Sequence, residues 1–167
     1  RLGSSLAAAQ NFFASQNAGA EDQILLYARV RDLAVAKGYL ENPELLAKIK
    51  ASGGTPPVAT FTTEIPIVDA FEQHEAPTYM TFEIDVTDIA KWNGVYGGAE
   101  KIEVRKMSGL KLIRLGKTEK GIIAFYAAAD AQAIKGMIAS NADLQASFEA
   151  DLSGVPSTLV VKAWKPF

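Results

Sequence analysis

The sequence contains no cysteine and only one histidine. Without cysteine the chain forms no disulfide, offers no thiolate to a metal ion and has no thiol nucleophile. A zinc site needs three or four ligands, so a single imidazole argues against a metal centre, and we expect no cofactor. No apolar run approaches the roughly 20 residues that a helix needs to span a bilayer, so we expect no transmembrane segment.

Neither sign of charge dominates, because 17 Lys and Arg stand against 19 Asp and Glu, for a formal net charge of −2. A nucleic-acid surface needs clustered basic side chains, so nucleic acid is not an expected partner. Phosphate-binding glycine loops and serine nucleophile elbows are also absent. The chain begins at Arg1 rather than at methionine. Either the N-terminus has been processed by removal of a leader, or the sequence is a fragment; we expect a soluble protein and leave the compartment open.

Residues 21–57 and 119–156 resemble each other when one single-residue gap is allowed. Such self-similarity predicts an internal duplication. The identical pairs are Glu21 and Glu119, Ile24 and Ile122, Asp32 and Asp130, Lys37-Gly38 and Lys135-Gly136, Asn42 and Asn141, Leu45 and Leu144, Ala47 and Ala146, Ala51 and Ala150, and Pro57 and Pro156.

Each copy predicts a strand, a helix and a second strand. Short apolar runs favour strands at Ile24–Val30 and Ile122–Ala128. Asp32 and Asp130 then stand where a helix N-cap is needed, and apolar residues recur at helical spacing behind each of them. Behind Asp32 this spacing predicts one helix that continues through Ile49. The closing strands are expected at Val58–Ile65 and Thr158–Trp164.

The second copy has further elements in front of it. Tyr79–Val86 alternates between apolar and polar residues, which predicts a half-buried strand. A helix is expected from about Asp88, with a break near Gly97-Gly98, because each glycine weakens a helix by about 1 kcal/mol relative to alanine. Leu110–Leu115 is the next expected strand. Residues 77–167 therefore predict the order βαββαβ of a ferredoxin-like unit.

The chain resembles the dimeric α+β barrel superfamily in three features. These are a tryptophan on the first helix (Lys91-Trp92), the strand Gly109–Arg114, and Asp130 at the start of a helix after Ile122–Tyr126. This group includes antibiotic-biosynthesis-monooxygenase-like and stress-responsive barrel proteins. The resemblance covers residues 77–167, and residues 11–66 as a partial second copy. It implies an α+β fold in which two ferredoxin-like units, present here in tandem as a pseudo-dimer, close into a barrel with the helices outside.

This interpretation divides the chain into an incomplete ferredoxin-like copy at 1–66, a linker at 67–76 and a complete copy at 77–167. Only Arg1–Gln10 precede Asn11–Gln16, which stands where the second strand of the first copy belongs. An alternative is that Ser4–Ser15 forms a helix. An unfilled first strand leaves strand edges and apolar surface open. We therefore expect another protein chain, or a cleaved segment, to bind near the N-terminal half.

Three residues are weak catalytic candidates. His74 is either a general base, because imidazole titrates near neutrality, or a solvated side chain of the linker. In the cofactor-free monooxygenases of the resembled family, Asn, Trp and His side chains orient the substrate and stabilise its anion, which implies such parts for Trp92 and Asn93. A tryptophan at this spacing is also typical of a core.

A second set of polar and aromatic residues is predicted to bind a ligand inside the barrel: Tyr79, Thr81, Glu83, Tyr126, Lys162 and Trp164. Glu83 and Lys162 are expected to face each other, because the first and fourth strands of a ferredoxin-like sheet are neighbours. The two form either part of a polar cavity or a structural cross-strand ion pair.

The small catalytic inventory and the incomplete first copy favour a non-catalytic accessory, assembly or binding subunit that associates with other chains. Two alternatives stay open. One is a cofactor-independent monooxygenase or isomerase that acts in the barrel cavity, and the other is a barrel that binds a small apolar ligand or pigment. A cavity with convergent polar groups would separate the last two from the first.

Overall fold

A computed structural model describes residues 9–17, 20–72, 78–140 and 159–166. The chain divides into two compact units, one made of Arg1–Ala14 and Leu26–Thr60, the other of Ser15–Leu25 and Phe61–Phe167. Among the described residues, no helix has the length and apolar character needed to cross a membrane.

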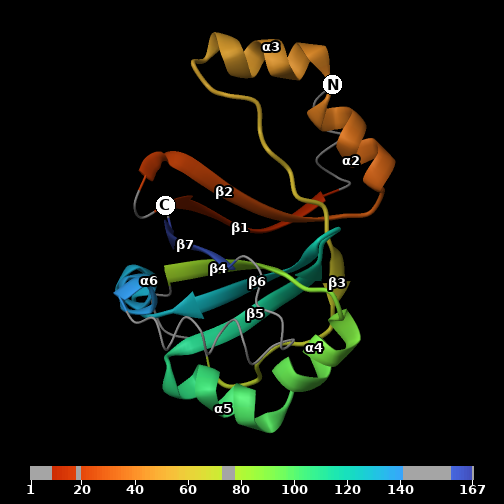
Figure 1. Cartoon of the computed structure of the whole chain (residues 1–167). Helices are drawn as coiled ribbons and strands as arrows, with labels where there is room; N and C mark the ends of the chain where they lie inside the picture. Colours follow the sequence, from red (N-terminus) through yellow and green to blue (C-terminus); the bar gives the residue numbers. More distant parts are fainter. Residues whose placement is uncertain (1–8, 18–19, 73–77, 141–158, 167) are drawn as a thin grey trace. The chain divides into compact units, whose positions relative to one another are not determined.

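The fold belongs to the α+β class (Figure 1). In chain order the described elements are β1 (Ala9–Asn17), β2 (Ala20–Val30), α2 (Leu33–Leu40), α3 (Pro43–Ala51), β3 (Thr63–Ile65), β4 (Thr78–Asp85), α4 (Ile89–Tyr96), α5 (Ala99–Met107), β5 (Leu110–Lys117), β6 (Gly121–Ala128), α6 (Ala131–Ser140) and β7 (Leu159–Pro166). The strands lie in the order β2-β1-β7-β4-β6-β5-β3.

Four neighbouring strands, in the order β7-β4-β6-β5, form the antiparallel sheet that carries the main core. Each of these strands lies where the apolar and alternating runs predict it. β4 pairs along its whole length with β6, from Thr78 opposite Ala128 to Asp85 opposite Gly121. The pairing of β5 with β6 shifts by one residue between Leu112 and Arg114, which marks an irregularity in β5.

Helices α4 and α6 contribute apolar side chains to the core of this sheet, and α5 (Figure 1) contributes the buried Arg105. Direct cross-strand partners share a face, and Met80 of β4 lies opposite Tyr126 of β6. The largest fully buried side chains are Trp92, Tyr126, Phe82, Met80, Leu110, Leu112, Leu115 and Ile122. Burying each large apolar side chain contributes about 1.5–3 kcal/mol. These residues hold α4 and the sheet together.

The predicted break in the first helix is confirmed, because α4 ends at Tyr96 and α5 begins at Ala99. A Cβ atom on Gly97 would lie 3.1 Å from the Asn93 carbonyl oxygen and 3.3 Å from Ile67 Cδ1. Glycine at this position therefore lets Ile67 pack closely against the end of α4.

The N-terminal half follows its local sequence signals. Ala9–Asn17 is a strand, so the alternative helix at Ser4–Ser15 is wrong from Ala9 onward. The Asp32 carboxylate accepts from the backbone N–H groups of Ala34 and Val35, at 2.9 and 3.1 Å, and caps α2 as predicted.

The single helix expected to continue through Ile49 is instead two helices, α2 and α3. Asn42 caps α3 through its side-chain oxygen, and Pro43 occupies the first turn. Asparagine before proline favours extended backbone and a new helix start, so this dipeptide ends the first helix.

The expected closed barrel is wrong. The closing strand predicted at Val58–Ile65 is only the three-residue strand β3, which pairs with β5. β1 pairs with β7, for example at Gln16 opposite Lys165. The described strands before residue 66 therefore extend the sheet of β7-β4-β6-β5 at its two ends, and they do not build a second sheet that would close against it.

Candidate functional site

The core of the larger unit contains a buried ion pair between Asp69 and Arg105, whose residues are only 5% and 3% exposed. Arg105 Nη2 lies 2.6 Å from Asp69 Oδ1, and Nε donates to Oδ2 at 2.9 Å. Two parallel hydrogen bonds of this kind are the strong, geometrically specific form of an arginine–carboxylate pair.

The pair connects four segments of the chain. Asp69 lies in the segment that follows β3, and Arg105 lies in the last turn of α5. The Asp69 backbone N–H donates to the Leu112 carbonyl at 3.0 Å, and the Asp69 carboxylate accepts from the Leu112 N–H at 2.9 Å. Arg105 Nη1 donates to the Tyr96 carbonyl at 2.9 Å, at the C-terminal end of α4. Each guanidinium nitrogen has a partner, which removes most of the cost of burying this charge.

Aromatic rings continue the cluster from Arg105 to the sheet. The Arg105 guanidinium lies 4.3 Å from the centroid of the Tyr96 ring, a cation–π distance. Tyr96 stacks on Trp92 with ring centroids 4.2 Å apart, and its hydroxyl is hydrogen-bonded to the Tyr126 hydroxyl. The Tyr126 ring in turn packs against the Phe82 ring, with the two ring centroids 4.8 Å apart.

The two phenols and the guanidinium of this cluster keep their protons at neutral pH. Burial raises the pKa of Tyr126 to about 12 and raises the pKa of Tyr96 well above its ordinary value. Burial alone would lower the pKa of Arg105, but the hydrogen bond to Asp69 and the electrostatic effects of Tyr96, Asp69 and Tyr126 together outweigh burial, and the pKa is raised. Two neutral phenols and a permanent cation do not exchange protons near neutrality.

In the described part of the chain, the buried polar atoms without a hydrogen-bond partner include Trp92 Nε1 and Asn93 Oδ1. Trp92 is fully buried, in agreement with the core interpretation of its spacing. Most buried polar atoms in folded proteins have a partner, so an unpartnered one calls for a physical explanation. These are two of the three residues that the sequence singles out as catalytic candidates. The third, His74, lies outside the described residues.

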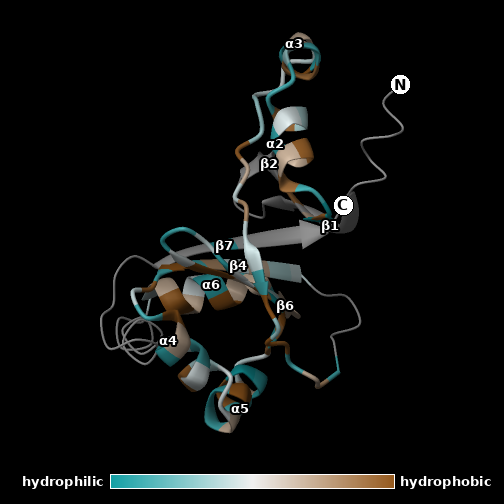
Figure 2. Ribbon diagram, turned by 90° about the vertical axis from the view of Figure 1, so that its right-hand side faces the viewer, coloured by the Kyte–Doolittle hydropathy of each residue, from teal (hydrophilic) through white to brown (hydrophobic). Residues whose placement is uncertain are grey.

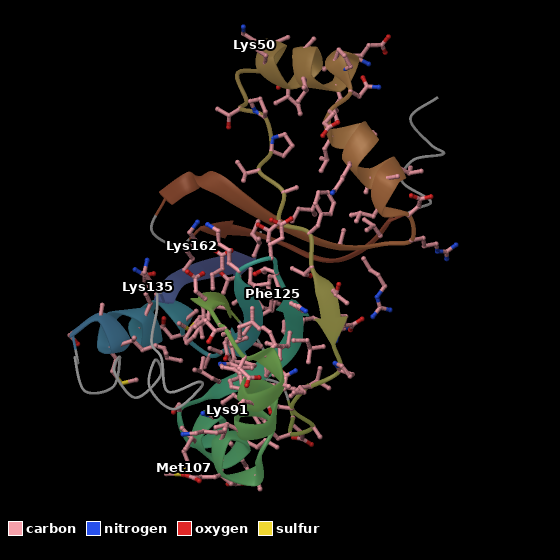
Figure 3. The ribbon with its side chains drawn as sticks, turned by 45° about the vertical axis from the view of Figure 1, so that its right-hand side comes forward. Lys50, Lys91, Met107, Phe125, Lys135 and Lys162 are labelled. Atoms are coloured by element: carbon pink, nitrogen blue, oxygen red, sulfur yellow. The ribbon has the colours of Figure 1, made fainter. Side chains whose placement is uncertain are left out.

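The register of the sheet places five of the six predicted ligand-binding positions on one face. Trp164 lies opposite Tyr79, and Lys162 (Figure 3) lies opposite Thr81, where it is exposed. Glu83 lies opposite Val160, so Glu83 and Lys162 are diagonal neighbours rather than direct partners. Diagonal side chains on a sheet interact more weakly than direct partners.

Tyr126, the sixth position, lies on the opposite face. It is the direct partner of Met80 and contributes to the helix-covered core. Thr81 and its cross-strand partner Phe125 are both buried, at 5% and 6% exposure. The six residues therefore do not form one site, and Tyr126 belongs with Tyr96 and Arg105.

No protein-family model, curated protein or solved structure matches this chain. The resemblance to the dimeric α+β barrel proteins therefore depends on the residues of this sequence alone. Among the described residues, no three His, Asp or Glu side chains gather into a group that could hold a metal ion.

Sequence reasoning missed Asp69 and Arg105, because the first lies in a segment expected to be a linker. A signal was present. Asp69 is the one charged residue in the otherwise apolar stretch Ile65–Phe71, and a lone carboxylate among apolar residues is often buried with a partner. Nothing in the sequence identifies that partner, which lies 36 positions away.

Proposed function

We propose that this chain is a non-catalytic binding or assembly subunit that associates with another protein chain through α2 and α3. The observation that carries the proposal is that neither helix contains a buried residue. Figure 2 shows hydrophobic and hydrophilic stretches mixed along both helices. Leu33 is 48% exposed and Val35 is 50% exposed, in the first turn of α2. Exposed apolar residues gathered on one element are typical of an interaction site.

The length of the two helices supports the same function. α2 has 8 residues and α3 has 9, and isolated helices shorter than about 12–15 residues are marginal in water. Although α2 and α3 contact each other, the apolar residues Leu40, Leu45 and Ile49 are only half-buried. A partner chain that covers these side chains would supply the burial that the pair lacks.

The buried cluster supports a structural role for the larger unit. Arg105 binds Asp69, and the Tyr96 and Tyr126 hydroxyls bind each other, so these polar groups find their partners within the fold. The strand order β7-β4-β6-β5 supports a ferredoxin-like arrangement of residues 78–166, and with it the proposed kinship to the dimeric α+β barrel proteins.

The experiment compares complexes of the tagged full-length chain, isolated from its source, by native mass spectrometry. The double variant Leu33→Ser/Val35→Ser is expected to lose the partner chain that the parent protein retains. Both side chains are about half exposed, so the free energy of unfolding should change by less than about 1 kcal/mol.

The matched control is Met107→Ser, which removes an apolar side chain that is 85% exposed at the end of α5 (Figure 3). This variant is expected to retain the partner. The proposal is wrong if the parent chain is isolated alone, or if the Leu33→Ser/Val35→Ser variant retains every partner of the parent.

A second candidate function is small-molecule binding, or cofactor-independent catalysis, at α4. The observation that favours it is the pair of unpartnered buried atoms, Trp92 Nε1 and Asn93 Oδ1. A ligand with one acceptor and one donor group would satisfy them. A small molecule that co-purifies with the parent chain and is lost from Asn93→Ala, while the Leu33→Ser/Val35→Ser variant keeps it, would favour this candidate.

A further inference from the structure

Strand β2 is one end of the sheet. It is the longest described strand, with 11 residues, and β1 is its only neighbour among the described strands. An end strand keeps one row of backbone N–H and C=O groups without a strand partner, and such a row is a template for pairing with another chain.

The two ends of the sheet differ in how they are protected. At one end, β3 has only three residues and is followed directly by Pro66, and both features discourage further strand pairing. At the other end, β2 contains no proline and carries the apolar run Ile24–Ala28. Leu26, in the middle of β2, is 60% exposed. β2 therefore has the length and composition of a strand that accepts a partner.

The charges of β2 indicate which partner fits. Its beginning is acidic, with Glu21 and Asp22, whereas its end is basic, with Arg29 in the strand and Arg31 directly after it. Two copies of β2 side by side in antiparallel orientation bring the acidic beginning of each next to the basic end of the other. Opposite charges across a strand pair stabilise it, and like charges, which a parallel arrangement would bring together, destabilise it.

We propose that two copies of this chain form a dimer by antiparallel pairing of their β2 strands, so that their sheets join across a two-fold axis. With the axis between Leu25 and Leu26, Asp22 of each copy is opposite Arg29 of the other. A self-complementary edge of this kind is the isologous contact that most homodimers use. The dimer goes beyond the proposed function, because it needs no other kind of chain and uses β2 rather than α2 and α3.

The experiment measures the mass of the purified full-length chain in solution by light scattering, over a range of concentrations. One variant makes the strand basic at both ends, Glu21→Arg/Asp22→Arg, and a second makes it acidic at both ends, Arg29→Glu/Arg31→Glu. The parent is expected to be a dimer. Each variant alone should have a dissociation constant raised about tenfold or more, because like charges then meet at both ends of the strand pair.

Mixing the two variants is the control for misfolding. The basic-ended and acidic-ended strands complement each other, so an equimolar mixture should form a heterodimer. Added salt should weaken the parent dimer, since charges at the rim of an interface are screened. The Leu33→Ser/Val35→Ser variant should dimerise like the parent, which separates this proposal from the one for α2 and α3.

Three outcomes would overturn the proposal. One is a parent chain that stays monomeric at every concentration. Another is a pair of charge variants that dimerise as tightly as the parent. The third is a dimer that dissociates when Leu33 and Val35 are replaced, because the contact would then lie on α2.

Discussion

At the scale of single residues, the core of the larger unit contains a buried arginine whose guanidinium nitrogens all have hydrogen-bond partners. Arg105 has three partners, which are the two carboxylate oxygens of Asp69 and the Tyr96 carbonyl. Replacing one member of a buried ion pair leaves the other charge without compensation. Replacing both members by apolar side chains of similar volume removes both charges, so neither position needs a counter-ion.

We therefore expect Asp69→Leu to lower the free energy of unfolding by about 3–5 kcal/mol, because Arg105 would stay buried without a counter-ion. The double variant Asp69→Leu/Arg105→Met should recover at least half of this loss. Urea unfolding followed by circular dichroism measures both values. A single variant that loses less than about 1 kcal/mol would contradict the structural role assigned to the pair.

The two buried tyrosines predict a loss of stability at alkaline pH. The pKa of Tyr126 is raised to about 12 and that of Tyr96 is raised as well. The unfolded chain therefore releases these protons first, near pH 10, and the stabilisation present below pH 10 is lost as the pH rises toward 12. Each phenol contributes a slope of up to about 1.4 kcal/mol per pH unit in this window.

The variant Tyr96→Phe/Tyr126→Phe removes both titrating groups and leaves no hydroxyl without its partner. Its free energy of unfolding should fall less steeply than that of the parent between about pH 10 and about pH 12. Urea midpoints measured at several pH values give the two slopes. Equal slopes in the parent and the variant would show that the phenols are not responsible.

At the scale of helices and strands, the sequence predicts what neighbouring residues determine. Asp32 and Asp130 cap their helices, and the glycine pair separates α4 from α5. These features depend on residues a few positions apart, so one sequence contains the full signal. Asn42-Pro43 is an equally local signal for the start of α3. The apolar residues continue at helical spacing across it, and they predict one helix where the structure has two.

Two glycines give opposite predictions for the same substitution. A Cβ atom on Gly121 at the start of β6 would overlap the backbone of Ile84 and Val86, whereas a Cβ atom on Gly94 in α4 would meet no atom within 4 Å. Gly121→Ala should therefore destabilise the protein by roughly 3 kcal/mol or more. Gly94→Ala should stabilise it by about 1 kcal/mol, since alanine is the better helix former. Thermal unfolding of both variants is the measurement, and effects of the same sign would contradict the geometry.

At the scale of the whole molecule, sequence reasoning fails where contacts are distant. The hydrogen-bonded residues Asp69 and Arg105 are 36 positions apart, and β3 pairs with β5, which follows β4 and two helices in the chain. Self-similarity in the sequence predicts similar local elements, but it does not determine whether two copies face each other or share one sheet. In this chain the three-residue strand β3 pairs with β5 and becomes one end of a single sheet.

The difference in burial between β6 and the helices α2 and α3 predicts a difference in local stability. β6 is buried along its whole length and has a strand on each side, whereas α2 and α3 contain no buried residue. Amide hydrogens exchange through local opening, which costs little where few apolar contacts are lost. In hydrogen-exchange mass spectrometry of the isolated chain, peptides of α2 and α3 should exchange far faster than those of β6. Bound to the partner chain proposed for these helices, the same peptides should become protected. Protection of α2 and α3 equal to that of β6 in the isolated chain would mean that their apolar side chains are already covered, and the reason for expecting a partner there would disappear.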